Sequence, residues 1–181
     1  MRRIIFCGAQ GTGKTTVLNY YEKMGYNCIT EVVRKLAKDG TNINESGDAE
    51  GQLTIFNKYA ELLGQQTSYI SDRGLIDVTA YSEYLKIFDE KLKDVVNNQR
   101  NYIKEFVKTN PDIVYCYFPI EFPIVDDGIR SLNENFRNYI DNKIKELLDT
   151  YIGDYYVIKG TRGERIRQIN NIIEQMNLNE I

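Results

Sequence analysis

The chain has 181 residues, of which 42% are hydrophobic and 27% charged, with a formal net charge of −3 and no histidine. This length predicts one domain over 1–181. The net charge gives no global basic field, although it leaves room for a local basic groove, so nucleic acid is a possible but not a favoured partner. No apolar run approaches the roughly 18 residues of a membrane span, so we expect a cytoplasmic protein. Because histidine is absent, catalysis has to use carboxylates, lysine, arginine and a bound cation.

Five short apolar runs alternate with longer segments of helical periodicity. This alternation predicts an α/β protein in which helices cover both faces of a parallel sheet. Tyrosine and β-branched residues are frequent in the runs, as they are in strands. The expected strands are Ile4–Cys7, Tyr26–Thr30, Ser68–Ser71, Ile113–Phe118 and Tyr155–Ile158.

Two local patterns predict where helices begin and where a loop lies. Ser131 with Glu134 and Thr161 with Glu164 have the spacing of a capping box, so we expect a helix to start at each pair. Residues 39–51 contain several glycines, asparagines and aspartates, which favour a loop between the second and third strands.

A glycine-rich turn follows the first strand directly and leads into a helix. Such a turn points consecutive backbone N–H groups at one place, where a triphosphate can bind. In this geometry Lys14 reaches the β- and γ-phosphates, the Thr15 hydroxyl ligates Mg²⁺ and Thr16 reaches the α-phosphate. We therefore expect Mg-ATP as cofactor. The residues expected to bind it are Gly8, Gln10, Gly11, Thr12, Gly13, Lys14, Thr15 and Thr16.

An acid and an arginine follow the third strand. Asp72 comes at its carboxyl end, the edge at which open α/β sheets bind ligands, so we expect it near Mg²⁺ together with Thr15. Arg73 can offer a planar pair of donors to phosphate oxygens. A hydrolytic ATPase usually carries a second acid at this point, so the arginine favours transfer to an organic acceptor.

The segment Ser71–Tyr81 resembles the Asp-Arg motif of thymidylate kinases, with Ala80 and Tyr81 at the same separation. It is still more similar to the kinase-like ATPase family that includes the nicotinamide riboside kinase domain of bacterial NAD regulators. The resemblance extends to 110–112 before the fourth strand and to 160–161 after the fifth. Gly74 and Asp77 depart from the thymidylate kinase pattern, so thymidine specificity is not expected.

This resemblance implies a three-layer α/β/α P-loop kinase fold with strand order 2-3-1-4-5 and a small lid at about 120–137. It also implies that Arg73 clamps acceptor or donor phosphate and that Asp72 supports magnesium. In the lid, Arg130 and Arg137 would close over the triphosphate, and arginines so placed stabilise the charge of the transferred group. The other interpretation is a capped helix with solvated arginines.

Two further regions are candidates for the ends of the bound molecules. The segment after the fifth strand, which includes Thr161, is where this fold usually holds the adenine ring. After the second strand, Glu31 and Arg34 lie three residues apart and share a face if the segment is helical. They face either the acceptor or only each other in a surface ion pair. Tyr81 is a weaker candidate for the wall of the acceptor pocket.

These features predict an ATP-dependent kinase of a nucleotide-type acceptor, with a (deoxy)nucleoside monophosphate as the leading acceptor. Glu31 favours a hydroxyl acceptor instead, because a carboxylate can take the hydroxyl proton, whereas Arg34 favours a phosphate. The hydroxyl would belong to a nucleoside such as nicotinamide riboside, or to modified DNA. An alternative of another class is a P-loop regulatory ATPase or switch. The sequence does not indicate the oligomeric state.

Overall fold

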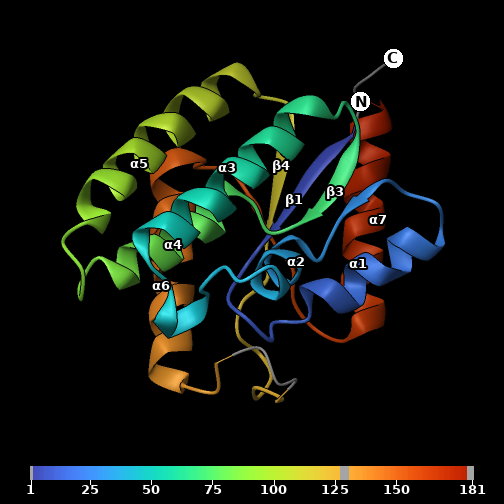
Figure 1. Ribbon diagram of the computed structural model, residues 1–181. Helices are drawn as coiled ribbons and strands as arrows, with labels where there is room; N and C mark the ends of the chain where they lie inside the picture. The colour runs from blue at the N-terminus through green and yellow to red at the C-terminus, as the bar shows by residue number, and fades with distance from the viewer. Residues whose placement is uncertain (1, 127–130, 179–181) are drawn as a thin grey trace.

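Five parallel strands form the centre of the molecule and helices flank them. The computed structural model describes residues 2–126 and 131–178. Figure 1 shows the arrangement of these elements. In chain order they are β1 (Arg3–Cys7), α1 (Lys14–Lys23), β2 (Cys28–Ile29), α2 (Val32–Lys38), the 3₁₀ turn η1 (Asn44–Ser46), α3 (Ala49–Gln65), β3 (Tyr69–Asp72), α4 (Leu75–Leu85), α5 (Leu92–Thr109), β4 (Ile113–Tyr117), α6 (Glu134–Tyr151), β5 (Tyr156–Val157) and α7 (Arg162–Leu178).

The strand order is β2-β3-β1-β4-β5, and every neighbouring pair is parallel, which confirms the predicted topology. The three inner strands match the apolar runs closely. The two edge strands, β2 and β5, have only two residues each and are shorter than the predicted 26–30 and 155–158. An edge strand has a partner on one side only, so fewer of its residues are held in the ladder.

The alternation of side chains along β1 divides the core into two layers. Ile4 and Phe6 pack with α1 and α7 on one face of the sheet. Ile5 and Cys7 pack on the other face with buried residues of α3, α4, α5 and α6. Figure 1 shows α1 and α7 together on one side of the sheet and the larger helical layer on the other. The sequence predicted helices on both faces because five apolar runs alternate with segments of helical periodicity, and the family resemblance implied three layers.

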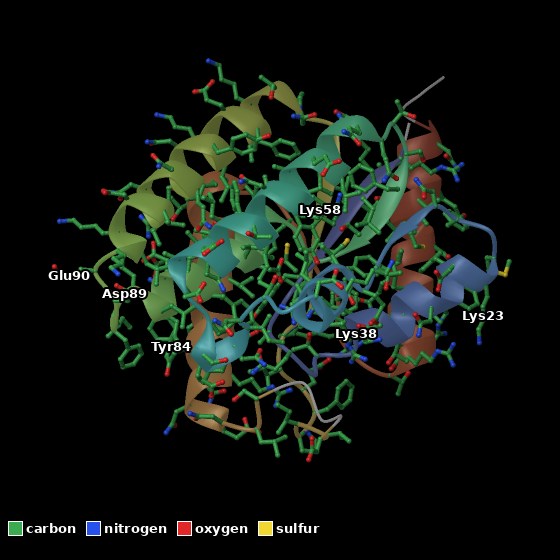
Figure 2. The ribbon with its side chains drawn as sticks, viewed as in Figure 1. Lys23, Lys38, Lys58, Tyr84, Asp89 and Glu90 are labelled. Carbon is green, nitrogen blue, oxygen red and sulfur yellow. The ribbon has the colours of Figure 1, made fainter. Side chains whose placement is uncertain are left out.

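Many charged side chains of the helices and turns are exposed to solvent. Lys23, Lys38 and Glu90 extend into solvent from three different parts of the surface (Figure 2). Within 2–126 and 131–178, no helix is both long and apolar enough to cross a membrane.

The helix starts agree only in part with the capping patterns. At α7, the backbone N–H and hydroxyl of Thr161 both donate to the Glu164 carboxylate, at 2.8 and 2.6 Å, as predicted. At α6 the prediction was wrong by two residues. Asn133 is the cap, because its side chain accepts the Phe136 N–H at 3.1 Å, while the Ser131 hydroxyl accepts the N–H of Asn133 itself. An asparagine two residues on from a serine is an equally good N-cap residue, and the sequence does not choose between them.

The predicted loop at 39–51 contains one short turn and the start of a helix. Asp48 caps α3 by accepting the Gly51 N–H at 2.7 Å, so this helix begins at Ala49, inside the expected loop. Before it, the 3₁₀ turn η1 lies beside the carboxyl edge of the sheet, where its first residue, Asn44, lines a cavity. The loop therefore contributes to the same edge as the strand ends.

Candidate active site

The glycine-rich turn at 8–13 connects β1 to α1 at the carboxyl edge of the sheet. Gly13 has φ 86°, a left-handed value that L side chains rarely adopt, and a Cβ there would lie 2.8 Å from Nη1 of Arg165. Gly8 is restricted by space, since a Cβ would collide with the carbonyl oxygen of Phe118. No side chain caps α1, so its first backbone N–H groups are available to an anion.

Lys14 begins α1 and its side chain turns back onto the loop. The ammonium donates to the carbonyl oxygens of Gly8 and Ala9, at 2.6 and 2.7 Å, and to the Thr12 hydroxyl at 3.1 Å. Burial, reinforced by the charge of Arg73, lowers the pKa of Lys14 to about 8. A buried ammonium whose hydrogen bonds are to neutral oxygens would gain strongly from an anionic ligand.

The Thr15 hydroxyl and the Asp72 carboxylate are directly linked, with 2.5 Å between Oγ1 and Oδ2. The other carboxylate oxygen of Asp72, Oδ1, is buried and has no hydrogen-bond partner among the described residues. Mg²⁺ in nucleotide sites is usually bound by one or two protein oxygens together with phosphate oxygens and water. A hydroxyl beside a carboxylate with an unsatisfied oxygen therefore fits Mg²⁺.

The turn after β3 holds Arg73 in a strained conformation, with φ 80°. Three hydrogen bonds fix this turn. The Arg73 N–H donates to the Phe6 carbonyl at 3.0 Å, the Ser71 hydroxyl donates to the Arg73 carbonyl at 2.7 Å, and the Tyr59 hydroxyl donates to the Asp72 carbonyl at 3.0 Å. A non-glycine residue persists at positive φ only where its surroundings enforce it, which is a feature of functional sites.

The side chain of Arg73 is oriented by Tyr81, on α4. Nη1 of Arg73 donates to the Tyr81 hydroxyl at 3.3 Å, and the guanidinium lies 5.3 Å from the centre of the tyrosine ring. The same hydroxyl donates to Oε1 of Gln10, in the glycine-rich turn, at 2.8 Å. Tyr81 thus connects Arg73 to the phosphate loop, and it also lines a small side cavity of about 50 Å³.

Glu31 and Arg34 lie where β2 ends and α2 begins. Glu31 is the N-cap residue of α2 and has φ 59°, again a left-handed value. Its carboxylate lies 3.4 Å from Nε of Arg34, so the two side chains share a face, and both are partly exposed. Both residues also line the main cavity, so this ion pair lies beside the site.

One cavity of about 440 Å³ brings these residues together. In the described chain, the non-glycine residues at positive φ are Glu31, Asn44 and Arg73, and all three line it. Strain is therefore concentrated at this one place, which identifies the cavity as the candidate active site. Its wall also includes Gln10, Gly11, Thr12, Gly13, Lys14, Thr15, Thr16, Arg34, Asp72, Phe122, Arg162 and Arg165.

The remaining residues predicted to bind ATP are not found in the cavity wall among the described residues. Arg137 does not point across the cavity as a lid arginine would. It is 1% exposed and donates to the carbonyl oxygens of Gln10 and Gly11, because α6 passes directly behind the glycine-rich turn. Thr161 caps α7 and is not among the cavity residues. Arg130 lies outside the described residues.

Two buried charged residues near the loop were missed by sequence reasoning. Asp77 is 0% exposed and accepts the N–H groups of Gly8 at 2.9 Å and Gly74 at 3.3 Å, while burial raises its pKa. An acid inside the apolar run Leu75–Ala80 was the available signal. Arg165 is 1% exposed and donates to the Thr12 carbonyl, and a helical arginine in a polar segment gives no such signal.

Three features together define a P-loop fold of the nucleoside and nucleotide kinase type. They are the order of the strands, the glycine-rich turn before α1 and the acid-arginine pair after β3. Residues 3–165 match the AAA_28 family, described as an AAA domain, and the chain belongs to this family. No match was found among curated proteins.

Solved structures share this fold at low sequence identity. A deoxyadenosine kinase from M. mycoides is 16% identical with a TM-score of 0.63, and the alignment covers 96% of this chain and 99% of that chain. A NadR protein in complex with NR is 13% identical with a TM-score of 0.73, covering 97% of this chain but only 52% of NadR. A thymidylate kinase from Ehrlichia chaffeensis is 18% identical with a TM-score of 0.52, covering 95% of this chain and 98% of that chain.

Proposed function

We propose that the protein is an ATP-dependent kinase that transfers the γ-phosphoryl group to a hydroxyl of a nucleoside-type acceptor. The observation that carries this proposal is the position of Glu31. Glu31 lines the same cavity as the phosphate loop and Arg73, and its backbone has a left-handed conformation that costs free energy to maintain. A carboxylate at this place would lie beside a bound acceptor and could accept a hydroxyl proton.

The donor side of the cavity supports ATP as the phosphoryl source. The N-terminus of α1 and the turn before it surround the place for the phosphates, and Lys14 reaches the same turn. Mg²⁺ bound by Thr15 and Asp72 would neutralise charge on the β- and γ-phosphates. Arg73, pre-oriented by Tyr81, is placed to stabilise the charge that spreads over the transferred group.

In the proposed reaction, the acceptor hydroxyl oxygen attacks the γ-phosphorus and its proton passes to the carboxylate of Glu31. The bond from the γ-phosphorus to the bridging oxygen breaks, and ADP leaves with that oxygen and its electron pair. Arg34, 3.4 Å from Glu31, holds the carboxylate at the wall of the cavity. Most of the rate enhancement in such a reaction comes from positioning and charge stabilisation.

A nucleoside monophosphate is the less favoured acceptor at this site. Its phosphate needs cationic groups, and the carboxylate of Glu31 beside it would be repulsive. Arg137, which the sequence offered as a further cation, donates to backbone carbonyls instead. Arg34 lines the cavity but is paired with Glu31, so the pair presents little net positive charge.

Replacing Glu31 by glutamine separates the two acceptors, because the expected effects differ in direction. With a hydroxyl acceptor, Glu31→Gln should lower kcat by roughly 10² or more. With a phosphate acceptor the rate should stay unchanged or rise, since a repulsive charge is removed. Glu22→Gln, on the exposed surface of α1, is the matched control and should leave the rate unchanged. A normal rate for Glu31→Gln with the best nucleoside would overturn the proposal.

The relatives named above suggest which acceptors to test. The panel should contain purine and pyrimidine deoxynucleosides, nicotinamide riboside, the corresponding monophosphates and single-stranded DNA. A regulatory ATPase would form ADP without an acceptor and at a rate that no member of the panel changes.

A further inference from the structure

Two buried arginines, Arg137 of α6 and Arg165 of α7, contact the glycine-rich turn, and Arg165 also lines the cavity. Arg137 and Arg165 are each 1% exposed. Nε of Arg137 donates to the Gln10 carbonyl at 3.0 Å and Nη2 donates to the Gly11 carbonyl at 3.2 Å. Nη1 of Arg165 donates to the Thr12 carbonyl. Three consecutive carbonyl groups of the turn are thus bound by guanidinium groups.

The direction of these carbonyls determines the direction of the neighbouring N–H groups. In a planar trans peptide the C=O of one residue and the N–H of the next point to opposite sides. Because guanidinium groups hold the carbonyls of residues 10–12, the N–H groups of Gly11, Thr12 and Gly13 point to the opposite side of their peptide planes. These three residues line the cavity. The positive charges behind the carbonyls also polarise the same peptide groups, which strengthens their N–H donors.

Both arginines occupy positions that are unfavourable for a cation. Each is the fourth residue of its helix, Arg137 in α6 and Arg165 in α7, so each lies in the first turn, where the helix dipole disfavours positive charge. Burial adds a desolvation cost. Two kinds of contact offset these costs: the hydrogen bonds to the carbonyls of the turn, and ion pairs of Arg165 with Glu121 at 2.6 Å and of Arg137 with Glu134 at 3.6 Å. The hydrogen bonds link both side chains to the phosphate site.

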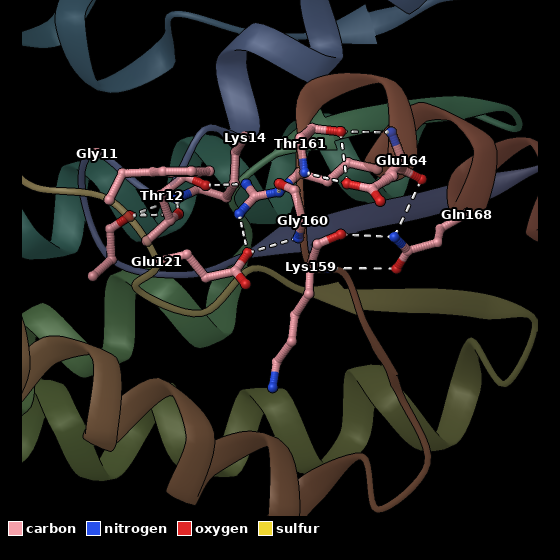
Figure 3. Close-up of polar contacts among 12 residues, drawn as sticks. Gly11, Thr12, Lys14, Glu121, Lys159, Gly160, Thr161, Glu164 and Gln168 are labelled. Atoms are coloured by element: carbon pink, nitrogen blue, oxygen red, sulfur yellow. Dashed lines mark hydrogen bonds and ion pairs between the residues drawn. The ribbon is translucent and has the colours of Figure 1, made fainter.

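A short segment after β4 joins the two arginines. The Phe122 carbonyl accepts from Nη2 of Arg137 at 2.9 Å, and the Phe122 ring lies 4.8 Å from the guanidinium of Arg165. The Glu121 carboxylate accepts from Nη2 of Arg165 at 2.6 Å and from the Gly160 N–H at 2.9 Å. Figure 3 shows the contact of Glu121 with Gly160 beside Thr12. The segments at 121–122 and 160 therefore hold the arginines in place.

We propose that Arg137 and Arg165, the arginine pair, are positioning residues that keep the phosphate loop in its triphosphate-binding conformation before ATP arrives. This proposal rests on the proposed function, because it assumes that the loop binds ATP. The role proposed for the arginine pair requires no contact with the acceptor or the reacting atoms. It acts through the N–H groups of the loop, so its loss should weaken ATP binding more than it slows the transfer step.

Equilibrium binding of ATP and of inorganic tripolyphosphate to single variants tests the proposal. Arg165→Met and Arg137→Met should each raise both dissociation constants by roughly tenfold or more, because a hydrogen bond to a charged donor is lost at the loop. The variants should raise KM for ATP by a similar factor while kcat at saturating ATP changes about threefold or less. Tripolyphosphate carries no base or sugar, so an effect on its affinity points to the phosphate loop.

Arg100→Met is the control, since Arg100 is also a helical arginine paired with a carboxylate, but it lies in α5 and its partner is Glu83 of α4. It should lower the melting temperature without changing either dissociation constant. Where a methionine variant does not fold, Arg165→Lys and Arg137→Lys keep one donor and the charge, and should show smaller increases in the same direction.

If the folded variants bind both ligands as tightly as the wild type, the proposed role of the arginine pair is overturned. The proposed kinase function would not be affected. An equal loss in Arg100→Met would also overturn it, because the effect would then reflect general destabilisation. A wild-type protein that binds neither ATP nor tripolyphosphate would overturn both this proposal and the proposed kinase function.

Discussion

The substitution Tyr81→Phe removes one hydroxyl from between Arg73 and Gln10 and leaves the ring in place. The phenol accepts from Arg73 at 3.3 Å and donates to Gln10 at 2.8 Å. The contact with Arg73 is long, so its loss lowers the free energy of unfolding by about 1 kcal/mol. The side-chain oxygen of Gln10, left without its donor, lowers it by about 1 kcal/mol more. For a chain of this size, a loss of about 2 kcal/mol lowers Tm by about 4 to 8 °C.

The functional consequence follows from the orientation of Arg73. Without the hydroxyl, the guanidinium keeps its contact with the ring, 5.3 Å from the ring centre, but loses the hydrogen bond that sets its direction. We expect kcat to fall by roughly tenfold while the affinity for ATP stays the same. Steady-state kinetics with the best acceptor, ATP titration and thermal melting measure the three quantities.

The control is Tyr21→Phe, on the opposite face of the sheet. The Tyr21 hydroxyl also lies between two partners, the Ile166 carbonyl at 3.1 Å and the Asn170 side chain at 2.9 Å. This variant should lose stability to a similar extent without any change in kcat. If Tyr81→Phe lowers Tm but leaves kcat at the wild-type value, Tyr81 has only a structural role and the reasoning about Arg73 is refuted.

Three further outcomes are expected. Burial lowers the pKa of Lys14 to about 8, so the ammonium is charged below that pH and neutral above it. ATP affinity should therefore fall by about tenfold per pH unit above pH 8. Lys14→Met should abolish this dependence. Asp72→Asn should raise the Mg²⁺ concentration needed for half-maximal activity by roughly 10- to 100-fold, and an unchanged Mg²⁺ requirement would argue against a metal at Asp72. Asp77→Ala should lower the free energy of unfolding by about 2 to 5 kcal/mol, because the N–H groups of Gly8 and Gly74 lose their acceptor. Urea denaturation measures this change, and a loss below about 1 kcal/mol would show that the two hydrogen bonds contribute little.

The sequence predicted the features that depend on local order along the chain. The glycine-rich turn, the inner strands and the acid-arginine pair after β3 are all contiguous patterns, and parallel topology brings strand ends to one edge. Even the ion pair of Glu31 and Arg34 follows from helical spacing, and the structure has it at 3.4 Å.

The sequence failed where a side chain acts far along the chain from its own position. Arg137 and Arg165 bind carbonyls that lie 127 and 153 residues away, and nothing near either arginine indicates these partners. A polar helix with an arginine usually faces solvent, and only the packing of α6 and α7 against the loop reverses that expectation. The backbone strain at Glu31 and Arg73 is equally invisible in residue type, since both residues ordinarily avoid positive φ.

The most direct test of the central claim is to incubate the wild-type protein with ATP labelled in the γ-phosphate, Mg²⁺ and each acceptor in turn, and to identify the labelled product. The account predicts a phosphomonoester on a nucleoside hydroxyl, with ADP formed in equal amount and only when the nucleoside is present. Label found only in inorganic phosphate, or transferred to a nucleoside monophosphate and to no nucleoside, would contradict it.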